Sequence, residues 1–221
     1  MKKMLFLTAV AAAWIACDRD DECRPTADDG QQITILAGIA DSKPVSDVIP
    51  ESKTTITGST AAWKSGDQLG LFCTQSVPAA VNVSFSATGN GASATWSADS
   101  PIYWGAPATT PHTFLAYSPY ASGNSSASAV KVPALNVQTG TVNPALDLLI
   151  SNNLASSGVL RSAGAVGLVF THALSLLEFD ITINSSIAAN TTLTSFTVAA
   201  GSSDKVYTTD GNSTIALSTG A

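Results

Sequence analysis

Residues 81–97 read VNVSFSATGNGASATWS, and this stretch decides the fold. Small polar residues alternate with its apolar residues, which are Val81, Val83, Phe85, Ala87, Ala92, Ala94 and Trp96. A period of two is typical of strands that bury one face. The pair Asn90-Gly91 between the two runs accepts the positive φ angles of a tight turn. The stretch therefore predicts a β-hairpin with one apolar face.

The same alternation extends over much of the chain. The predicted inward residues of two further strands are Ile33, Ile35, Ala37 and Ile39, then Leu69, Leu71 and Cys73. Strands are also predicted over residues 113–117, 129–132, 166–170, 175–183, 193–199, 205–209 and 214–217. Residues 40–52 predict a loop, Asp210-Gly211 a second hairpin turn, and residues 145–154 one short helical turn. About ten short strands separated by turn signals indicate an all-β fold, arranged as a β-sandwich.

The first 16 residues resemble a secretory signal peptide. Lys2 and Lys3 precede an apolar run that ends at Ala16 and is too short to span a bilayer. Residues 14–17, Trp-Ile-Ala-Cys, resemble the lipobox of bacterial lipoproteins, with Trp where Leu is commonest. They predict cleavage between Ala16 and Cys17 and acylation of the Cys17 thiol. A plain signal peptide, in which Cys17 is incidental, is the alternative.

Beyond the leader, the chain divides into two parts. Residues 17–30 are acidic and polar and predict a flexible tether, whose start resembles a surface-export signal of lipoproteins. Residues 31–221 predict a β domain, since about 200 residues suffice for one large domain. The chain stops shortly after the last predicted hairpin, so we expect it to be a fragment of a longer product.

Composition limits the class of protein further. Hydrophobic residues make up 45% of the chain and charged residues only 12%, about half the usual share. The net charge of −6 comes largely from the acidic tether. A neutral surface rich in Ser, Thr, Asn and Gly suits a protein that packs against copies of itself. It lacks the basic patch that nucleic-acid binding requires, so no nucleic-acid partner is expected.

No residue constellation indicates an enzyme, a metal site or a cofactor. His112 and His172 have no acidic or cysteine neighbour in the sequence, so both are predicted to be structural. Nucleophile elbows, phosphate loops and metal-binding histidine pairs are all missing from the sequence. Asp67 and Asp99 are predicted turn residues rather than the paired carboxylates of a glycosidase.

Two sets of side chains leave alternatives open. Cys23 and Cys73 predict one flexible thiol and one buried thiol, with a disulfide between them as the alternative. Trp63, Tyr103 and Trp104 predict either core residues or an exposed platform on which sugars stack. The platform would make the protein a glycan-binding lipoprotein of the cell surface.

Three segments resemble motifs of the fimbrillin family, lipoproteins of the Bacteroides group. AWKSGDQLGLF at residues 62–72 resembles Trp-x-x-Gly-Asp-x-Ile-Gly-Leu-Phe, and FLAYSPY at residues 114–120 resembles Phe-x-Ala-Tyr-x-Pro-Tyr. FTHALSLLEF at residues 170–179 resembles Phe-x-His-x-Leu-Ser-x-Leu-x-Phe. The motif residues that match, and that the resemblance implies are structural, are Trp63, Gly66, Asp67, Tyr117, Pro119, Tyr120 and His172.

The resemblance implies a fold, a location and partners. Family members are pilus subunits, anchors and tip adhesins built from two transthyretin-like Greek-key β-sandwich domains, and residues 31–221 match the first domain. The implied location is the outer membrane surface, with a lipid on Cys17. The implied partners are other fimbrial subunits, with ligands on host or bacterial surfaces.

The resemblance also implies an assembly mechanism. In the family, a protease removes the first strand, and the groove left behind accepts a strand from a neighbouring subunit. Residues 31–40 would be that strand, with Ile33, Ile35, Ala37 and Ile39 facing the groove. Some members are cut after an arginine, but no arginine occurs here between residues 24 and 161. Two readings stay open: a different protease cuts at Lys43 or Lys53, or the strand is retained and the protein is an anchor.

Overall fold

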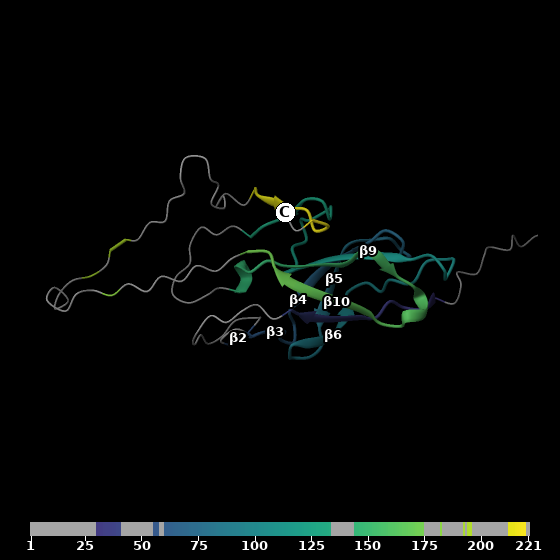
Figure 1. Cartoon of the computed structure of the whole chain (residues 1–221), viewed down its shortest axis with the longest axis horizontal. Coiled ribbons are helices and arrows are strands. Elements are labelled where there is room, and N and C mark those ends of the chain that lie inside the picture. Colours follow the sequence, from purple (N-terminus) through teal and green to yellow (C-terminus); the bar gives the residue numbers. More distant parts are fainter. Residues whose placement is uncertain are drawn as a thin grey trace, which may run out of the picture.

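The computed structural model describes residues 30–40, 55–57, 60–133, 144–174, 182, 192, 194–195 and 212–219. Strands dominate this part of the chain, as Figure 1 shows. They are β1 (Ile35–Ile39), β2 (Thr55–Thr57), β3 (Thr60–Ala62), β4 (Gln68–Cys73), β5 (Ala80–Ala87), β6 (Ser93–Ala98), β7 (His112–Ser118), β8 (Val130–Lys131), β9 (Leu149–Val159), β10 (Val166–His172) and β11 (Thr214–Ile215). Two 3-10 helices, η2 (Pro144–Leu146) and η3 (Arg161–Ala163), flank β9. The prediction of an all-β fold is confirmed.

Seven of these strands form one closed sheet, in the order β1, β10, β9, β7, β4, β5, β6. β6 pairs with β1 and completes the ring. The β1–β10 pair is parallel, and every other neighbouring pair in the ring is antiparallel. β2 with β3 and β8 with β11 form two small sheets. The sequence predicted a sandwich, whereas the described strands form a single ring because β1 joins β6 to β10.

Apolar side chains from all seven strands fill the inside of the ring. Trp63, just after β3, contacts the ring of Trp96 edge-on, with centroids 4.9 Å apart, and that of Phe170 at 5.2 Å. Edge-to-face pairs of this kind add about 0.5–1.5 kcal/mol each beyond the burial of their area. The inward residues predicted for residues 33–37 and 69–73 all lie in this core.

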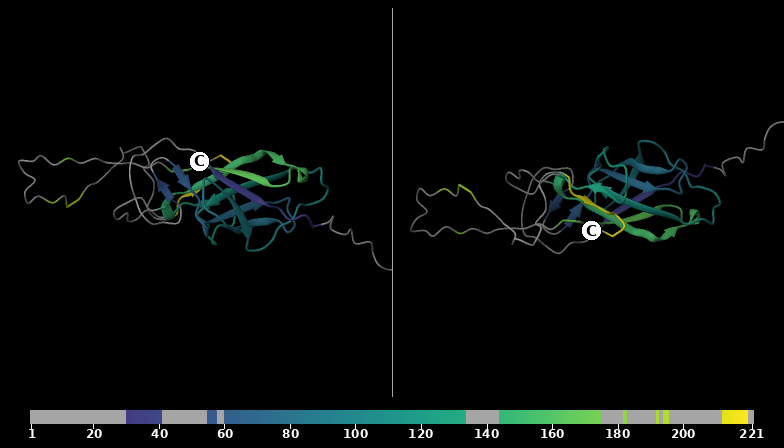
Figure 2. Two further views of the ribbon diagram at one scale, coloured as in Figure 1. Left: turned by 90° about the horizontal axis from the view of Figure 1, so that it is seen from below. Right: turned by 90° about the horizontal axis from the view of Figure 1, so that it is seen from above.

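A second apolar cluster lies outside the ring. Phe72, Tyr117 and Ile150 come from β4, β7 and β9 and pack against side chains around β8 and β11. Figure 2 shows residues 212–219, in yellow, lying along the closed sheet. Because both faces of β4 are covered, its residues 69–73 are all buried.

The predicted hairpin exists, but its turn differs from the prediction. β5 and β6 pair antiparallel, and residues 88–92 connect them. Of Asn90 and Gly91, only Gly91 has a positive φ, 131°. Gly91 also exchanges backbone hydrogen bonds of 2.8 and 2.9 Å with Trp63. The connection is therefore longer than a tight Asn-Gly turn because Gly91 pairs with the chain before β4.

The alternation within β5 also fails at its start. Val81 is 56% exposed and Asn82 only 8%, the reverse of the prediction. The two residues lie opposite Phe72 alone, since Leu71 pairs with Val83 and the residue after Phe72 pairs with Ala80. This two-against-one arrangement is a β-bulge, and Asn82 has a φ of 55°. The bulge exposes Val81 and places Asn82 against Tyr117, on the outer face of the ring.

β9 is a strand that the sequence did not predict. Its residues LISNNLASSGV are rich in Ser and Asn, so they lack a β pattern. Pairing with β7 holds it in place, and the predicted helical turn is limited to η2. The strands predicted at 113–117, 129–132, 166–170 and 214–217 are confirmed by β7, β8, β10 and β11. The predictions for residues 41–52, 175–181, 196–199 and 205–211 fall outside the described residues.

Candidate functional site: the slot of the first strand

β1 lies in a slot between β6 and β10. It runs parallel to β10, with Ile35 opposite Val166 and Ile39 opposite Phe170. On its other side it runs antiparallel to β6, with Ile35 opposite Trp96. Both edges of β1 are thus paired, and no other pairing among the described strands links β6 to β10.

Hydrogen bonds extend the slot beyond both ends of β1. Upstream, the Ile33 amide donates to the Ile102 carbonyl at 2.9 Å, and the Trp104 amide donates to the Gln31 carbonyl at 3.0 Å. Downstream, the Ala40 amide donates to the Phe170 carbonyl at 2.8 Å. The segment held by the slot is therefore residues 31–40, which is the segment predicted as the first strand.

The inward side chains of this segment are deeply buried. Ile33 is 2% exposed, while Ile35 and Ala37 are fully buried. Ile39 is partly buried and packs against the same core. Full burial of an isoleucine side chain contributes about 1.5–3 kcal/mol, so the segment contributes substantially to stability. Leu36, which points outward, is 38% exposed.

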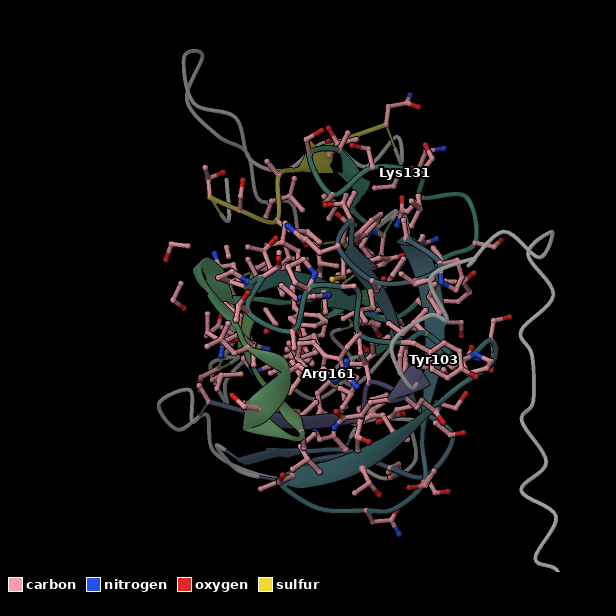
Figure 3. The ribbon with its side chains drawn as sticks, turned by 90° about the vertical axis from the view of Figure 1, so that its right-hand side faces the viewer. Tyr103, Lys131 and Arg161 are labelled. Atoms are coloured by element: carbon pink, nitrogen blue, oxygen red, sulfur yellow. The ribbon has the colours of Figure 1, made fainter. Side chains whose placement is uncertain are left out.

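Arg161 and Tyr103 lie at the end of the sheet where this segment begins, and Figure 3 labels both, well apart from Lys131. Arg161 donates from Nε to the side-chain oxygen of Gln31 at 3.1 Å. The backbone of Tyr103 bridges to Gln32 on one side and to Val77 on the other. The entrance of the slot is therefore held by side-chain and backbone contacts together.

The seam between β9 and β10 depends on Asn153. The two strands share only two residue pairs, both at the far end of β10. Nearer the slot entrance, the Asn153 carboxamide donates to the Gly167 carbonyl and accepts from the Val169 amide, both at 3.1 Å. It thus takes the place of a peptide group on a neighbouring strand. No sequence signal separates Asn153 from Asn152 beside it, so sequence reasoning could not find this role.

The segment 62–72 forms a turn into β4. The Asp67 carboxylate accepts from the Lys64 amide at 2.8 Å, and the Asp67 amide donates to the Lys64 carbonyl at 3.0 Å. Gly66 has a φ of 91°, a conformation that glycine adopts without strain. The turn places Trp63 in the core. It also binds to the end of β5, because the Gly66 amide donates to the Ala87 carbonyl at 2.9 Å.

The segment 114–120 forms a corner at the end of β7. The Tyr117 hydroxyl lies 2.7 Å from Asn82 Oδ1 and accepts from the Ala121 amide at 3.1 Å. Burial raises the pKa of Tyr117. A Cβ on Gly70 would lie within 3.0 Å of both the Tyr117 ring and Asn82. After the cis peptide bond to Pro119, the Tyr120 amide donates to the carbonyl that begins β4, at 3.1 Å.

Both histidines lie in structural positions. His112 is buried, accepts from the Gly105 amide through Nε2 and donates through Nδ1 to the Thr110 carbonyl, both at 2.9 Å. His172 pairs with Asp147, with 2.8 Å between Nδ1 and Oδ1. This partner is 25 residues away in the sequence and was not predicted. Its hydrogen bond raises the pKa of His172.

The aromatic platform for sugars, one of the two alternatives for these side chains, is not formed. Trp63 and Trp104 are buried, and Trp104 packs edge-on against His112 with ring centroids 4.9 Å apart. Only Tyr103 is partly exposed. Of the two alternatives, the exposed platform is therefore excluded, because Trp63 and Trp104 are part of the core.

The remaining predicted residues can be placed only in part. Cys73 is a free, buried thiol, and burial raises its pKa. Cys23, like Ala16, Cys17, Lys43 and Lys53, lies outside the described residues. Within the described ranges, the acidic, histidine and cysteine side chains form no group that could hold a metal ion.

None of the helices among the described residues has the length and apolarity needed to cross a membrane.

Comparison with known proteins places this architecture in a family. The chain resembles a crystal structure, at 1.67 Å, of a candidate cell adhesion protein from Bacteroides uniformis, with 19% identity and a TM-score of 0.42. That similarity covers 64% of this chain and 47% of the other, so it spans about half of that protein. No curated protein matches the chain. The model of the fimbrillin-like family matches residues 54–220, well over half of the 221 residues, and the protein therefore belongs to the fimbrillin-like family.

Proposed function

We propose that the protein is a non-enzymatic structural subunit or anchor of a surface fimbria, and that it assembles by strand exchange at the slot of β1. The observation that carries this proposal is the position of residues 31–40. They are paired on both sides and bury Ile33, Ile35 and Ala37 in the core. Family membership supports assembly with other fimbrial subunits.

Removal of residues 31–40 would create a receptive surface. It would free one edge each of β6 and β10, and unpaired edges readily accept another strand. It would also open the core beneath Ile33, Ile35 and Ala37 to water. An incoming strand with alternating apolar residues would restore both the hydrogen bonds and the buried area. The subunit would therefore be ready to polymerise only after the cut.

The proposal also covers the cellular location of the protein and its domain architecture. Cys17 carries acyl chains, and the protein reaches the outer face of the outer membrane behind the tether of residues 17–30. Residues 31–221 form the first of two transthyretin-like Greek-key sandwich domains, in which the closed sheet is a flattened sandwich. Assembly then supports adhesion to host or bacterial surfaces.

Mass spectrometry of the mature protein from cells tests this proposal. A diacylated Cys17 with residues 31–40 intact identifies an anchor. A new N-terminus between Ala40 and Thr54, near Lys43 or Lys53, identifies a polymerising subunit. An unmodified Cys17 on the surface-exposed protein would refute the lipoprotein part. Protein that stays monomeric after the cut, with residues 31–40 released, would refute strand exchange.

A further inference from the structure

The inner face of the slot carries two small side chains at one position, that of Ala37. On the β6 side Ala37 lies opposite Ala94, and on the β10 side it lies opposite Leu168. All three side chains are buried. Two neighbouring alanines leave a space on the inner face that another side chain must fill, since protein interiors are closely packed.

The indole of Trp63 is placed to fill this space. It contacts Trp96, which lies opposite Ile35, and Phe170, which lies opposite Ile39. These two contacts lie in the rows on either side of Ala37. These contacts favour a position of the indole over the row between them, that of Ala37.

We infer that Trp63 makes the slot selective for an extended strand with a small side chain at its third inward position, between large apolar ones. In this chain the inward residues Ile33, Ile35, Ala37 and Ile39 have that order. As applied to a strand from another subunit, the inference rests on the proposed strand exchange. As applied to β1 itself, it stands on the contacts of the intact chain.

This selectivity also fixes the register of the bound strand. A shift by one residue would turn the apolar side chains outward. A shift by two residues keeps them inward but brings Ile35 or Ile39 to the position of Ala37, where each would place three more carbons than the alanine side chain does. The small side chain at position 37 is therefore what distinguishes the correct register from its neighbours.

A size exchange in the intact chain provides the first test. Ala37→Leu should lower the melting temperature by about 2–12 °C, because overpacking a core is destabilising. Thr34→Leu adds a similar side chain at an exposed position of the same segment and should leave it nearly unchanged. The double variant, Trp63→Leu with Ala37→Leu, should lose much less melting temperature than the two single variants lose together. Strictly additive losses would overturn the inference.

A peptide exchange provides the second test. A protease site is inserted between Lys43 and Lys53, the folded full chain is cut there, and labelled peptides of residues 31–40 compete for the slot. The native peptide and its Ala37→Ser version should enter, and the Ala37→Ile version should bind at least tenfold more weakly. Equal binding of all three would overturn the selectivity. If no peptide enters while the size exchange shows coupling, the proposed strand exchange fails and the fit between Trp63 and Ala37 stands.

Discussion

Shortening one inward side chain of β1 measures how strongly the slot holds its strand. Ile35 is fully buried and lies between Val166 and Trp96 in the sheet. Ile35→Ala removes three carbons, worth about 2.4 kcal/mol at 0.8 kcal/mol for each. The packed aromatic rings nearby limit collapse, so a cavity adds to this loss. We expect the free energy of unfolding to fall by about 3–4 kcal/mol.

Leu36→Ala is the matched control, because it removes three carbons from the neighbouring residue. Leu36 points outward and is 38% exposed, so its loss should be at most about 1.5 kcal/mol and should leave no cavity. Urea unfolding gives both values. With a slope of about 2 kcal/mol/M, the midpoint should fall by about 1.5–2 M for Ile35→Ala and by under 1 M for Leu36→Ala. Equal losses, or a larger loss for Leu36→Ala, would refute the assignment of inward and outward faces.

Three further predictions concern other parts of the closed sheet. Gly70→Ala should lower the free energy of unfolding by about 1–3 kcal/mol because its Cβ would meet the Tyr117 ring. Gly167→Ala, where a Cβ has open space around it, should lower it by less than about 1 kcal/mol. Urea titrations measure both values. Asn153→Leu should speed hydrogen exchange of the Val169 amide, which donates to the Asn153 carboxamide, while exchange in β4 stays unchanged. Unchanged exchange at Val169 would show that the carboxamide does not hold β9 and β10 together. The folded state binds the His172 proton more tightly than the unfolded state, so its stabilising effect should be full below about pH 6.5 and fall as the pH rises through the raised pKa. Urea midpoints across this range should show the fall in the native chain and lose it in Asp147→Asn.

The role of Asn153 follows from the position of β10 in the ring. If β1 is removed, β10 keeps two residue pairs with β9 and the two hydrogen bonds of this carboxamide. Each hydrogen bond contributes about 0.5–1.5 kcal/mol net. In the proposed strand exchange, Asn153 would thus help to hold β10 in place while the slot is empty.

Much of the fold was predictable because local pattern determines it. The alternation of Ile33, Ile35 and Ala37 with polar or outward residues specifies a strand and its buried face without reference to the rest of the chain. β9 was not predictable in this way. Its serine and asparagine residues have no strong strand preference, and backbone pairing with β7 determines its conformation.

The bulge in β5 could not be predicted from the sequence, for a similar reason. The sequence around Val81 and Asn82 continues a regular alternation, yet the structure exposes Val81 and buries Asn82 on the outer face of the ring. A hydrogen bond of 2.7 Å to the Tyr117 hydroxyl satisfies its carboxamide there. That partner is 35 residues away, so the gain exists only once β4, β5 and β7 are assembled.

The sequence alone determined the all-β class, the buried face of the first strand and the presence of the motifs that mark the family. Only the tertiary structure decided that β1 is paired on both edges, that Trp63 packs against both Trp96 and Phe170, and that Trp104 is core rather than a sugar platform. The physical reason is the range of the interactions. Period and turn chemistry act between residues close in the chain. Closure of the sheet by β1 joins residues more than 50 positions apart and has no local signal.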